Sequence, residues 1–282
     1  MGIPEGMTAA GRDGVAGVVA QPSRTVVALD FDGTLAPIVA DPASARAHPG
    51  AAAALAALAP LVDSVVVVTG RPAAVAVEYG GLADVPGLER LTVLGQYGAE
   101  RWEAATGEVV APEVHPGVAG VRAELPAALA RAGAPEGTWV EDKGRALGVH
   151  TRRTADPDAA LDLLRAPLAE LAERHALIVE PGRMVLELRP PGVDKGAALT
   201  GYLAERGPGP VVYAGDDLGD LPAYAAVERR RAEGLPALLV CSGPVTGEPP
   251  VRELADRADV VVPGPAGVVE LLSGLAELIR AR

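Results

Sequence analysis

Short runs of apolar, β-branched residues recur along the chain, and stretches of helical periodicity lie between many of them. A continuous apolar run of this kind is typical of a strand buried on both faces, as in a parallel sheet. The runs predict strands over residues 25–29, 64–69, 91–94, 211–214, 238–240 and 260–262. The clearest helical stretches are residues 51–61, 195–206 and 267–281. This alternation predicts an α/β fold with a doubly wound, mostly parallel sheet, whose ligands bind at the carboxyl ends of the strands.

Residues from about 116 to 189 follow a different pattern, in which helix and hairpin alternate twice. The second helix begins at Asp156-Pro157 and carries an apolar stripe, whereas Pro126 predicts a kink or break in the first helix. A small α+β cap domain is therefore expected between two halves of the larger domain. The expected divisions are a flexible N-terminal tail at 1–23, the larger domain at 24–108 and 190–282, and the inserted cap at 109–189.

The first predicted hairpin of this middle region has a register that follows from its turn. Gly144-Arg145 suits a two-residue type II′ turn, because glycine is favoured at the first position of such a turn. Alternation along the strands then places Val140, Leu147 and Val149 on one face, which can pack on the helices. The opposite face is polar, with room for a ligand, and carries Trp139, Glu141, Lys143, His150 and Arg152. A second hairpin is predicted with strands over 176–180 and 183–189.

The composition narrows the class of protein. The chain has 282 residues, of which 25 are Lys or Arg and 37 are Asp or Glu, so the formal net charge is −12. Nucleic acids and anionic membranes bind basic surfaces, so neither is expected as a main partner. The single cysteine, Cys241, excludes an internal disulfide framework and a cysteine-rich zinc site. No membrane-spanning segment or signal peptide is recognised, and the expected location is the cytoplasm.

Two carboxylates stand directly after the first predicted strand, in Asp30-Phe31-Asp32-Gly33-Thr34. They can face one site once the backbone turns, and Gly33 permits that turn. One carboxylate can act as a nucleophile and magnesium ligand while the other transfers a proton to the leaving group. An acid-rich turn that merely closes the strand is the alternative interpretation.

Three further motifs stand at strand ends or helix starts. Thr69-Gly70-Arg71 offers a hydroxyl and backbone N–H groups to a phosphate oxygen, and Asp194-Lys195-Gly196 places a cation beside phosphate and the attacking carboxylate. Residues 215–220 gather Asp216, Asp217 and Asp220, whose mutual repulsion a hard cation such as Mg²⁺ would relieve. Each motif alone also fits an ordinary turn or a solvated surface. Their joint occurrence in this order is far more specific than any one of them.

These four motifs resemble those of the haloacid-dehalogenase superfamily of phosphatases, and the interval between Arg71 and Lys195 leaves room for a cap domain. Within that superfamily, the chain resembles the trehalose-6-phosphate phosphatase family over roughly residues 25–274. The segments that carry this narrower resemblance are 30–37 (DFDGTLAP), 95–100 (GQYGAE), Glu141-Asp142-Lys143 with His150 and Arg152, and Glu187-Leu188-Arg189-Pro190 with Lys195-Gly196. The nucleophile motif is specific only to the superfamily, whereas the cap residues point to this sugar phosphate.

The resemblance implies a role for each matched residue. Asp30 would attack phosphorus and form an aspartyl-phosphate, and Asp32 would protonate the leaving sugar oxygen and then activate water. Thr69 and Lys195 would hold the phosphoryl oxygens. Mg²⁺ would bind Asp30, the backbone carbonyl of Asp32 and Asp216, with Asp217 or Asp220 as a further ligand or beside the ligands. Substrate contacts would come from Gly70, Arg71, Glu141, Lys143, His150, Arg152 and Glu187, although a structural hydrogen bond is the alternative role of His150.

The chain departs from the family pattern at three positions. Tyr97 stands where the family usually has His, and Gly219 and Leu221 stand where its fourth motif usually has Thr and Glu. Because Asp216, Asp217 and Asp220 are present, we expect a monomeric, Mg²⁺-dependent phosphatase that hydrolyses trehalose 6-phosphate, a small-molecule sugar phosphate. The alternatives are a phosphatase of sucrose phosphate or mannosyl-3-phosphoglycerate, a phosphosugar mutase, and a sensor that binds a sugar phosphate without turnover.

Overall fold

The computed structural model describes residues 4, 6–39, 41–182, 184–244 and 249–282. The chain divides into two compact units. The core unit comprises Met1–Ala111 and Asp194–Arg282, and the inserted unit comprises Pro112–Val193. The sequence placed these divisions after residues 108 and 189. The core unit is therefore built from two separate segments of the chain, with the inserted unit contiguous between them.

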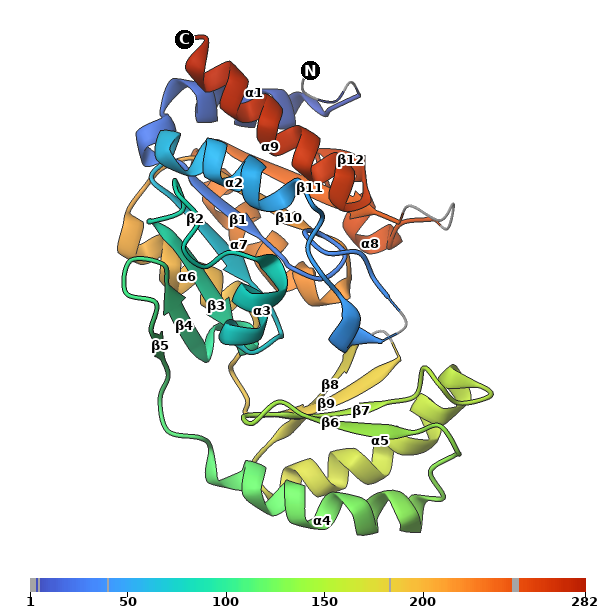
Figure 1. Ribbon diagram of the computed structural model, residues 1–282. Coiled ribbons are helices and arrows are strands. Elements are labelled where there is room, and N and C mark those ends of the chain that lie inside the picture. The colour runs from blue at the N-terminus through green and yellow to red at the C-terminus, as the bar shows by residue number, and fades with distance from the viewer. Residues whose placement is uncertain (1–3, 5, 40, 183, 245–248) are drawn as a thin grey trace. The chain divides into compact units, whose positions relative to one another are not determined.

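The sheet of the core unit has, over the described residues, eight strands in the order β12-β11-β10-β1-β2-β3-β4-β5 (Figure 1). The strands are β1 (Val26–Leu29), β2 (Ser64–Val68), β3 (Leu91–Gly95), β4 (Glu100–Glu103), β5 (Val109–Val110), β10 (Val211–Gly215), β11 (Ala237–Gly243) and β12 (Val260–Pro263). From β12 to β3 all neighbours are parallel, whereas β4 and β5 pair antiparallel. The predicted α/β class and its six parallel strands are confirmed. The sequence missed β4 and β5, which are short and lack a continuous apolar run.

Helices cover both faces of this sheet, and alternate residues of each strand face opposite layers. On β1, Val27 and Leu29 belong to the apolar cluster on one face of the sheet, whereas Val26 and Ala28 belong to the cluster on the other face. The helices of the first layer are α1 (Ala9–Ala20), α2 (Ala51–Leu58), α3 (Ala73–Gly80) and α9 (Gly264–Arg280), and those of the second are α6 (Lys195–Arg206), α7 (Leu221–Ala232) and α8 (Arg252–Ala255). Short 3₁₀ turns occupy Pro22–Arg24, Pro42–Ser44, Ala59–Leu61, Gln96–Gly98 and Leu218–Asp220. Both faces of the central strands are thus buried, which explains their unbroken apolar runs.

The N-terminal segment corrects one expectation, because residues 9–20 form helix α1 rather than a flexible tail. Thr8 caps the helix by accepting from the N–H of Gly11, and its hydroxyl donates to Asp259. Gly14 lies so close to β11 that a Cβ there would stand 2.2 Å from the carbonyl oxygen of Ala237. The glycines that make this segment look loose in sequence are therefore what allows the helix to approach the sheet.

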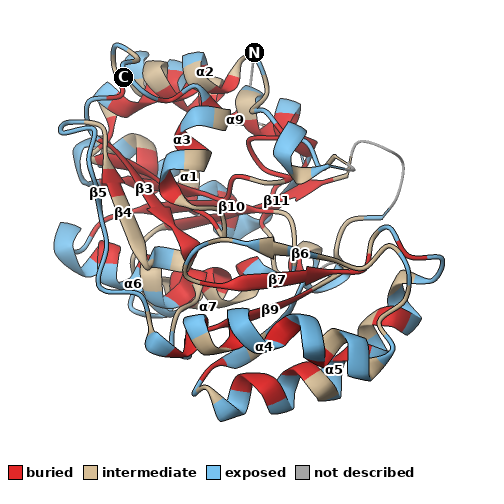
Figure 2. Ribbon diagram, turned by 60° about the horizontal axis from the view of Figure 1, so that its bottom comes forward, coloured by how far each residue is buried: buried red, intermediate tan, exposed pale blue. Residues whose placement is uncertain are grey.

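The inserted unit is a four-stranded antiparallel sheet in the order β6-β7-β9-β8, with two helices packed on one face. Its elements are α4 (Pro116–Ala132), β6 (Trp139–Asp142), β7 (Leu147–His150), α5 (Pro157–Arg174), β8 (Ile178–Gly182) and β9 (Val185–Arg189). Figure 2 shows that α4 and α5 each have a buried side and an exposed side, as amphipathic helices do. The predicted alternation of helix and hairpin is confirmed.

Two local details of the inserted unit differ from the expectation. Helix α4 continues through Pro126 without a break, since this proline lies on the exposed side, where water can satisfy the carbonyl it leaves unpaired. Strand β8 extends to Gly182, which pairs with Val185, whereas the sequence predicted the turn at residues 181–182. Residue 183, which was expected to begin the second strand, lies outside the described residues. The first hairpin has the predicted register, with Val140 opposite Val149 and a positive φ at Gly144.

Among the described helices, none combines the length and the apolar character needed to cross a bilayer.

Candidate active site

The candidate site lies where β1 and β10 end next to each other. β1 pairs with β10 on one side and with β2 on the other, so the chain winds away from this point in both directions. In an open parallel sheet, such a switch point is where ligands bind. Asp30 directly follows β1 and Asp216 directly follows β10, and the N–H of Asp30 donates to Ala214 O at 2.9 Å. The topology therefore brings the first and fourth sequence motifs together.

Lys195, the first residue of α6, joins these two motifs. Its Nζ lies 2.8 Å from Asp30 Oδ1 and 2.8 Å from Asp220 Oδ1. Asp194 caps the helix by accepting from the N–H of Ala197, which fixes the first turn and hence the lysine. The side chains of Lys195 and Asp30 are each only 5% exposed, and that of Asp220 is fully buried. An ion-pair group of this kind is stable in the interior only while every member keeps its partners.

Asp220 is the hydrogen-bonding centre of the group. Its Oδ1 accepts from Lys195 Nζ and from the hydroxyl of Tyr213 at 2.6 Å, and its Oδ2 accepts from the N–H groups of Asp216 and Asp217. Four donors occupy the acceptor positions of one carboxylate. Asp217 instead caps the following 3₁₀ turn, with its Oδ1 accepting from the N–H of Gly219 at 2.8 Å. In the acidic motif, Asp220 thus organises the loop and Asp217 caps the 3₁₀ turn, whereas Asp216 has neither of these two roles.

Burial changes the protonation behaviour of these groups. Desolvation raises the pKa of Asp30 well above its ordinary value, and the nearby Asp220 raises it further while Lys195 opposes the shift. Desolvation and the charges of Asp217 and Asp30 raise the pKa of Asp216 in the same way. For Lys195, burial lowers the pKa, but the carboxylates of Asp220 and Asp30 outweigh it, and the net shift is upward. The site holds more negative charge than one lysine neutralises, which favours a bound cation.

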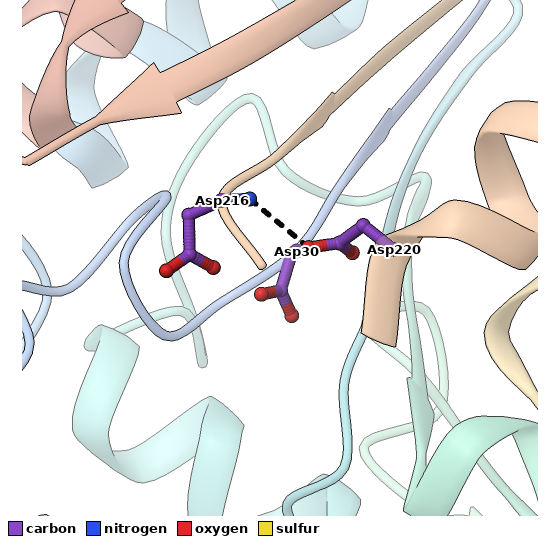
Figure 3. A group of neighbouring side chains, drawn as sticks. All are labelled: Asp30, Asp216 and Asp220. Carbon is purple, nitrogen blue, oxygen red and sulfur yellow. Dashed lines mark hydrogen bonds between the residues drawn. The ribbon is translucent and has the colours of Figure 1, made fainter. Parts of the chain in front are cut away.

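Asp30, Asp216 and Asp220 form a group that could hold a metal ion (Figure 3). Each offers one carboxylate oxygen, and the three oxygens lie within 4.8 Å of one another. A set of carboxylate oxygens suits a hard divalent cation. Gly33 faces the same place: its φ is +76°, and a Cβ there would lie 2.0 Å from Asp216 Oδ2. Of the predicted metal ligands, the carboxylates of Asp32 and Asp217 are not in this group.

The Thr69-Gly70-Arg71 motif follows β2 and is shaped by the loop after β3. The hydroxyl of Thr69, which is buried, accepts from the N–H of Arg71 at 3.1 Å, so its proton is available to another acceptor. The N–H of Tyr97 donates to Thr69 O, and a Cβ on Gly70 would lie 2.7 Å from the phenol of Tyr97. Gln96 and Tyr97 have φ of 46° and 57°, which is uncommon for residues other than glycine. Such strained backbone is a recurrent property of functional sites.

Asp32 and Arg71 form a pair that the sequence did not predict. Arg71 Nε donates to Asp32 Oδ2 and Nη2 donates to Oδ1, both at 2.7 Å. The sequence assigned Arg71 to the substrate, whereas the structure places its guanidinium on Asp32. The two carboxylates of the first motif therefore face different cations, Lys195 for Asp30 and Arg71 for Asp32.

One face of the sheet in the inserted unit is polar, as predicted for the first hairpin. Lys143 Nζ lies 2.6 Å from Glu187 Oε2, and Glu141 Oε2 lies 2.9 Å from His150 Nε2. The ring of Trp139 stacks on that of His150 with centroids 3.9 Å apart. We call Trp139, Glu141, Lys143, His150 and Glu187 the polar face.

Two members of the predicted hairpin faces lie elsewhere than expected. β7 ends at His150, so Arg152 lies in the following turn rather than on the strand. Val140, expected to pack on the helices, is 40% exposed, because β6 is the edge strand of its sheet.

Sequence reasoning missed Tyr213 and Ser242. Tyr213 donates to Asp220, and the Ser242 hydroxyl donates to Gly33 O at 2.6 Å. Ser242 stands near the end of β11, so the rule that parallel strands end at one edge could have indicated it. Tyr213 stands inside an apolar run, and nothing in the pattern marks it as polar in function.

Comparisons with known proteins show which family the sequence matches. A family model described as "Trehalose-phosphatase" matches residues 28–255. A trehalose-phosphate phosphatase of Mycolicibacterium paratuberculosis is 38% identical over 247 residues, covering 81% of this chain and 56% of that protein. An uncharacterised glycosyl hydrolase of Mycobacterium tuberculosis is 38% identical over 219 residues, covering 72% of this chain and 15% of that protein. This chain therefore spans about half of the first relative and a small part of the second.

A solved structure extends the comparison to the fold. The C-terminal domain of the Candida albicans trehalose-6-phosphate phosphatase matches with a TM-score of 0.74 at 20% identity, covering 96% of this chain and 98% of that one. At this identity the likeness concerns the fold alone.

Proposed function

The chain belongs to the trehalose-phosphatase family, and on this premise we propose that it hydrolyses trehalose 6-phosphate to trehalose and phosphate. The observation that carries the proposal is the position of Lys195, 2.8 Å from both Asp30 and Asp220 at the ends of two adjacent strands. A buried lysine beside a nucleophilic carboxylate can neutralise a phosphoryl group as it is transferred.

Asp30 is the proposed nucleophile of the first half-reaction. One of its carboxylate oxygens bonds to phosphorus while the bond from phosphorus to the sugar oxygen breaks, which yields an aspartyl-phosphate. Asp32, protonated on one oxygen and held by Arg71 through the other, gives its proton to the departing sugar oxygen, so that trehalose leaves as a neutral alcohol. Lys195 and the hydroxyl of Thr69 donate to the phosphoryl oxygens throughout.

Water completes the second half-reaction. Asp32, now a carboxylate, takes a proton from water as the water oxygen bonds to phosphorus, and the bond from phosphorus to Asp30 breaks. Phosphate leaves, and both aspartates return to their starting protonation states. Splitting the hydrolysis in this way replaces one difficult displacement by two easier ones.

The proposed cofactor is Mg²⁺, held by Asp30 and Asp216 with the backbone carbonyl of Asp32. The carboxylates of Asp30 and Asp216 suit this ion, since Mg²⁺ prefers oxygen ligands, and the carbonyl of Asp32 is assigned from the family resemblance. Because Asp220 accepts from four donors, we assign it the role of holding Lys195 and the loop rather than binding the ion directly. When bound, the cation would screen the negative charge of the phosphoryl group as Asp30 approaches it.

Recognition of the sugar is assigned to the polar face and to Arg152. Glu141, Lys143 and Glu187 offer acceptors and donors that suit the many hydroxyls of a disaccharide. His150 is tied to Glu141, so its role in this proposal is to orient that carboxylate. The planar stack of Trp139 on His150 stiffens the same row of side chains.

Phosphate release tests this function directly. The purified protein with Mg²⁺ is expected to release inorganic phosphate from trehalose 6-phosphate, and Asp30→Asn is expected to reduce the rate by at least about 10³-fold, as for loss of a nucleophile. A trapped phosphoprotein that the variant lacks would identify the intermediate. If the wild-type protein binds the sugar phosphate but releases no phosphate from it, the protein is instead a sensor.

A panel of phosphate esters tests the substrate separately from the chemistry. Trehalose 6-phosphate is expected to be hydrolysed faster than sucrose phosphate and mannosyl-3-phosphoglycerate. A higher kcat/KM on either rival would replace the trehalose assignment but keep the proposed roles of Asp30 and Lys195. A product that retained its phosphate on another hydroxyl would indicate a mutase.

A further inference from the structure

The nucleophile and the proton-transfer residue are only two positions apart, yet each is paired with its own cation. Asp30 Oδ1 lies 2.8 Å from Lys195 Nζ. Both oxygens of Asp32 accept from Arg71, whose side chain is 13% exposed. A planar guanidinium that binds both oxygens fixes the orientation of a carboxylate, which a single ammonium cannot do.

Contacts that do not involve Asp32 hold Arg71 in place. Its Nη2 also donates to Pro42 O at 3.0 Å, and its Cζ lies 5.7 Å from the ring centre of Phe31 and 5.2 Å from that of Tyr79. Its backbone N–H donates to Thr69 Oγ1, and its carbonyl accepts from the N–H of Gln96. The guanidinium therefore has a defined position before any substrate arrives.

We propose that Arg71 is a positioning residue that keeps the carboxylate of Asp32 apart from Lys195 and the cation site. This inference rests on the proposed function. Without Arg71, the carboxylate of Asp32 would lose the two hydrogen bonds that fix its orientation and would be free to turn toward other cations, whose attraction is strong in a partly buried site. Arg71 thus lets two adjacent carboxylates perform two different tasks, and its role differs from the substrate contact implied by the resemblance.

The two roles can be distinguished by the leaving group of the substrate. A purely structural role of Arg71 would not change the ratio of the rates on a sugar ester and on an aryl ester. A sugar alkoxide is a poor leaving group and needs a proton from Asp32, whereas p-nitrophenolate is stable and leaves without one. A defect in the orientation of Asp32 should therefore slow the first half-reaction selectively on the sugar ester. The second half-reaction, in which Asp32 activates water, is common to both esters, so the comparison uses release of the leaving group in the first turnover. A defect in folding or in phosphate binding should affect both esters alike.

The experiment compares Arg71→Ala and Arg71→Lys with the wild type on trehalose 6-phosphate and on p-nitrophenyl phosphate, both with Mg²⁺. For Arg71→Ala, we expect the rate of leaving-group release in the first turnover to fall roughly 100-fold on the sugar ester and less than about 5-fold on the aryl ester, with the apparent dissociation constants of both esters nearly unchanged. The rate of Arg71→Lys on the sugar ester should lie between those of the wild type and Arg71→Ala, because lysine keeps the charge but cannot bind both carboxylate oxygens of Asp32 in a fixed geometry.

Two further variants separate the proposal from loss of structure. In an Asp32→Asn background, adding Arg71→Ala should change the sugar-ester kcat less than about 3-fold, since residues that act as one unit are non-additive. Arg46→Ala is the matched control: Arg46 stacks on Tyr79 at 4.1 Å and donates to the carbonyls of Ala43 and Ala45. It should leave both activities near the wild-type level.

Three outcomes would overturn the proposal. They are an equal fall of the first-turnover rate on both esters, weaker binding of both esters with that rate unchanged, and a full additional loss in the Asp32→Asn background. Failure of the proposed function would look different, because the wild type itself would not release phosphate from trehalose 6-phosphate. The same comparison would then be made with an alkyl phosphate that the wild type does hydrolyse.

Discussion

The strand-end site of the core unit and the polar face of the inserted unit both consist of charged side chains, but they are built in opposite ways. In the core unit, the key groups follow the ends of parallel strands, and Asp30, Asp220 and Lys195 are almost completely buried. In the inserted unit, the groups alternate along antiparallel strands, and Glu141 is one-third exposed. Backbone topology sets the first arrangement, whereas the side-chain pattern sets the second.

This difference has an energetic consequence. Each buried charge of the core site has lost its water and depends on its partners, so a single replacement leaves another charge unpaired at a cost of about 3–5 kcal/mol. Pairs on the polar face keep partial access to water, which weakens their contribution to stability. We therefore expect changes at the core site to affect every phosphate ester, and changes on the polar face to affect sugars alone.

The largest effect is expected from Lys195→Met, which keeps the length of the side chain without its charge. Asp30 and Asp220 would then face each other without a cation, and kcat on both trehalose 6-phosphate and p-nitrophenyl phosphate should fall by at least about 10²–10³-fold. Steady-state kinetics on the two esters is the measurement. The double variant Lys195→Met with Asp220→Asn removes one of the two unpaired charges, so it should regain part of the thermal stability but not the activity. A selective loss on the sugar ester alone would contradict the comparison.

A smaller and more selective effect is expected from Glu187→Gln on the polar face. Glu187 is 4% exposed, and its bond to Lys143 at 2.6 Å joins two charged groups. A charged hydrogen bond is worth about 1.5–3 kcal/mol, so KM for trehalose 6-phosphate should rise about 10-fold or more while p-nitrophenyl phosphate is unaffected. Glu173→Gln is the matched control, since Glu173 is exposed and lies on helix α5 rather than on the sheet. Equal losses on both esters would show that the polar face is not specific for sugar.

The smallest expected effect is a dependence of metal stabilisation on pH. Burial raises the pKa values of Asp30 and Asp216, so the folded state binds protons more tightly than the unfolded chain does. This contribution to the free energy of unfolding is complete below the ordinary carboxyl pKa and is lost as pH rises through the raised values. A divalent cation replaces those protons. Millimolar Mg²⁺ should therefore raise Tm by on the order of 5 °C at about pH 8 and by much less at about pH 5.

Thermal denaturation with Mg²⁺ or with a chelator measures this shift. Asp216→Asn is the control variant, because it removes a proposed ligand and should abolish most of the effect of Mg²⁺ at the higher pH. An equal Tm increase at both pH values would mean that the cation does not compete with protons at these carboxylates.

The sequence predicted those parts of the molecule whose structure is determined by the local pattern of apolar, polar and turn-forming residues. Unbroken apolar runs identified β1 and β10, and Gly144 determined the register of the first hairpin. The acids at the strand ends were found because position after a buried strand is itself a signal. Local pattern failed for α1, where glycines that permit close packing on β11 looked like a loose tail.

The features that sequence could not predict depend on segments that meet only in the folded state. Nothing near Asp32 indicates that its partner is Arg71, because the pair joins loops after two different strands. The same holds for Tyr213, whose hydroxyl reaches Asp220 across the turn that follows its own strand. Motif recognition therefore selected charged residues that the fold brings together at the strand ends, but it did not determine which charge neutralises which.

The discontinuous core unit has a consequence for how the chain emerges from the ribosome. β1 is made early, but β10, its parallel neighbour, is made only after the whole inserted unit. The contiguous inserted unit can form its own apolar cluster first, while β1 still has one edge without its partner strand β10. The free edge of β1 in nascent chains should therefore need protection until the residues of β10 leave the exit tunnel. Truncation of the chain within residues 194–282 should yield aggregates rather than a smaller folded protein.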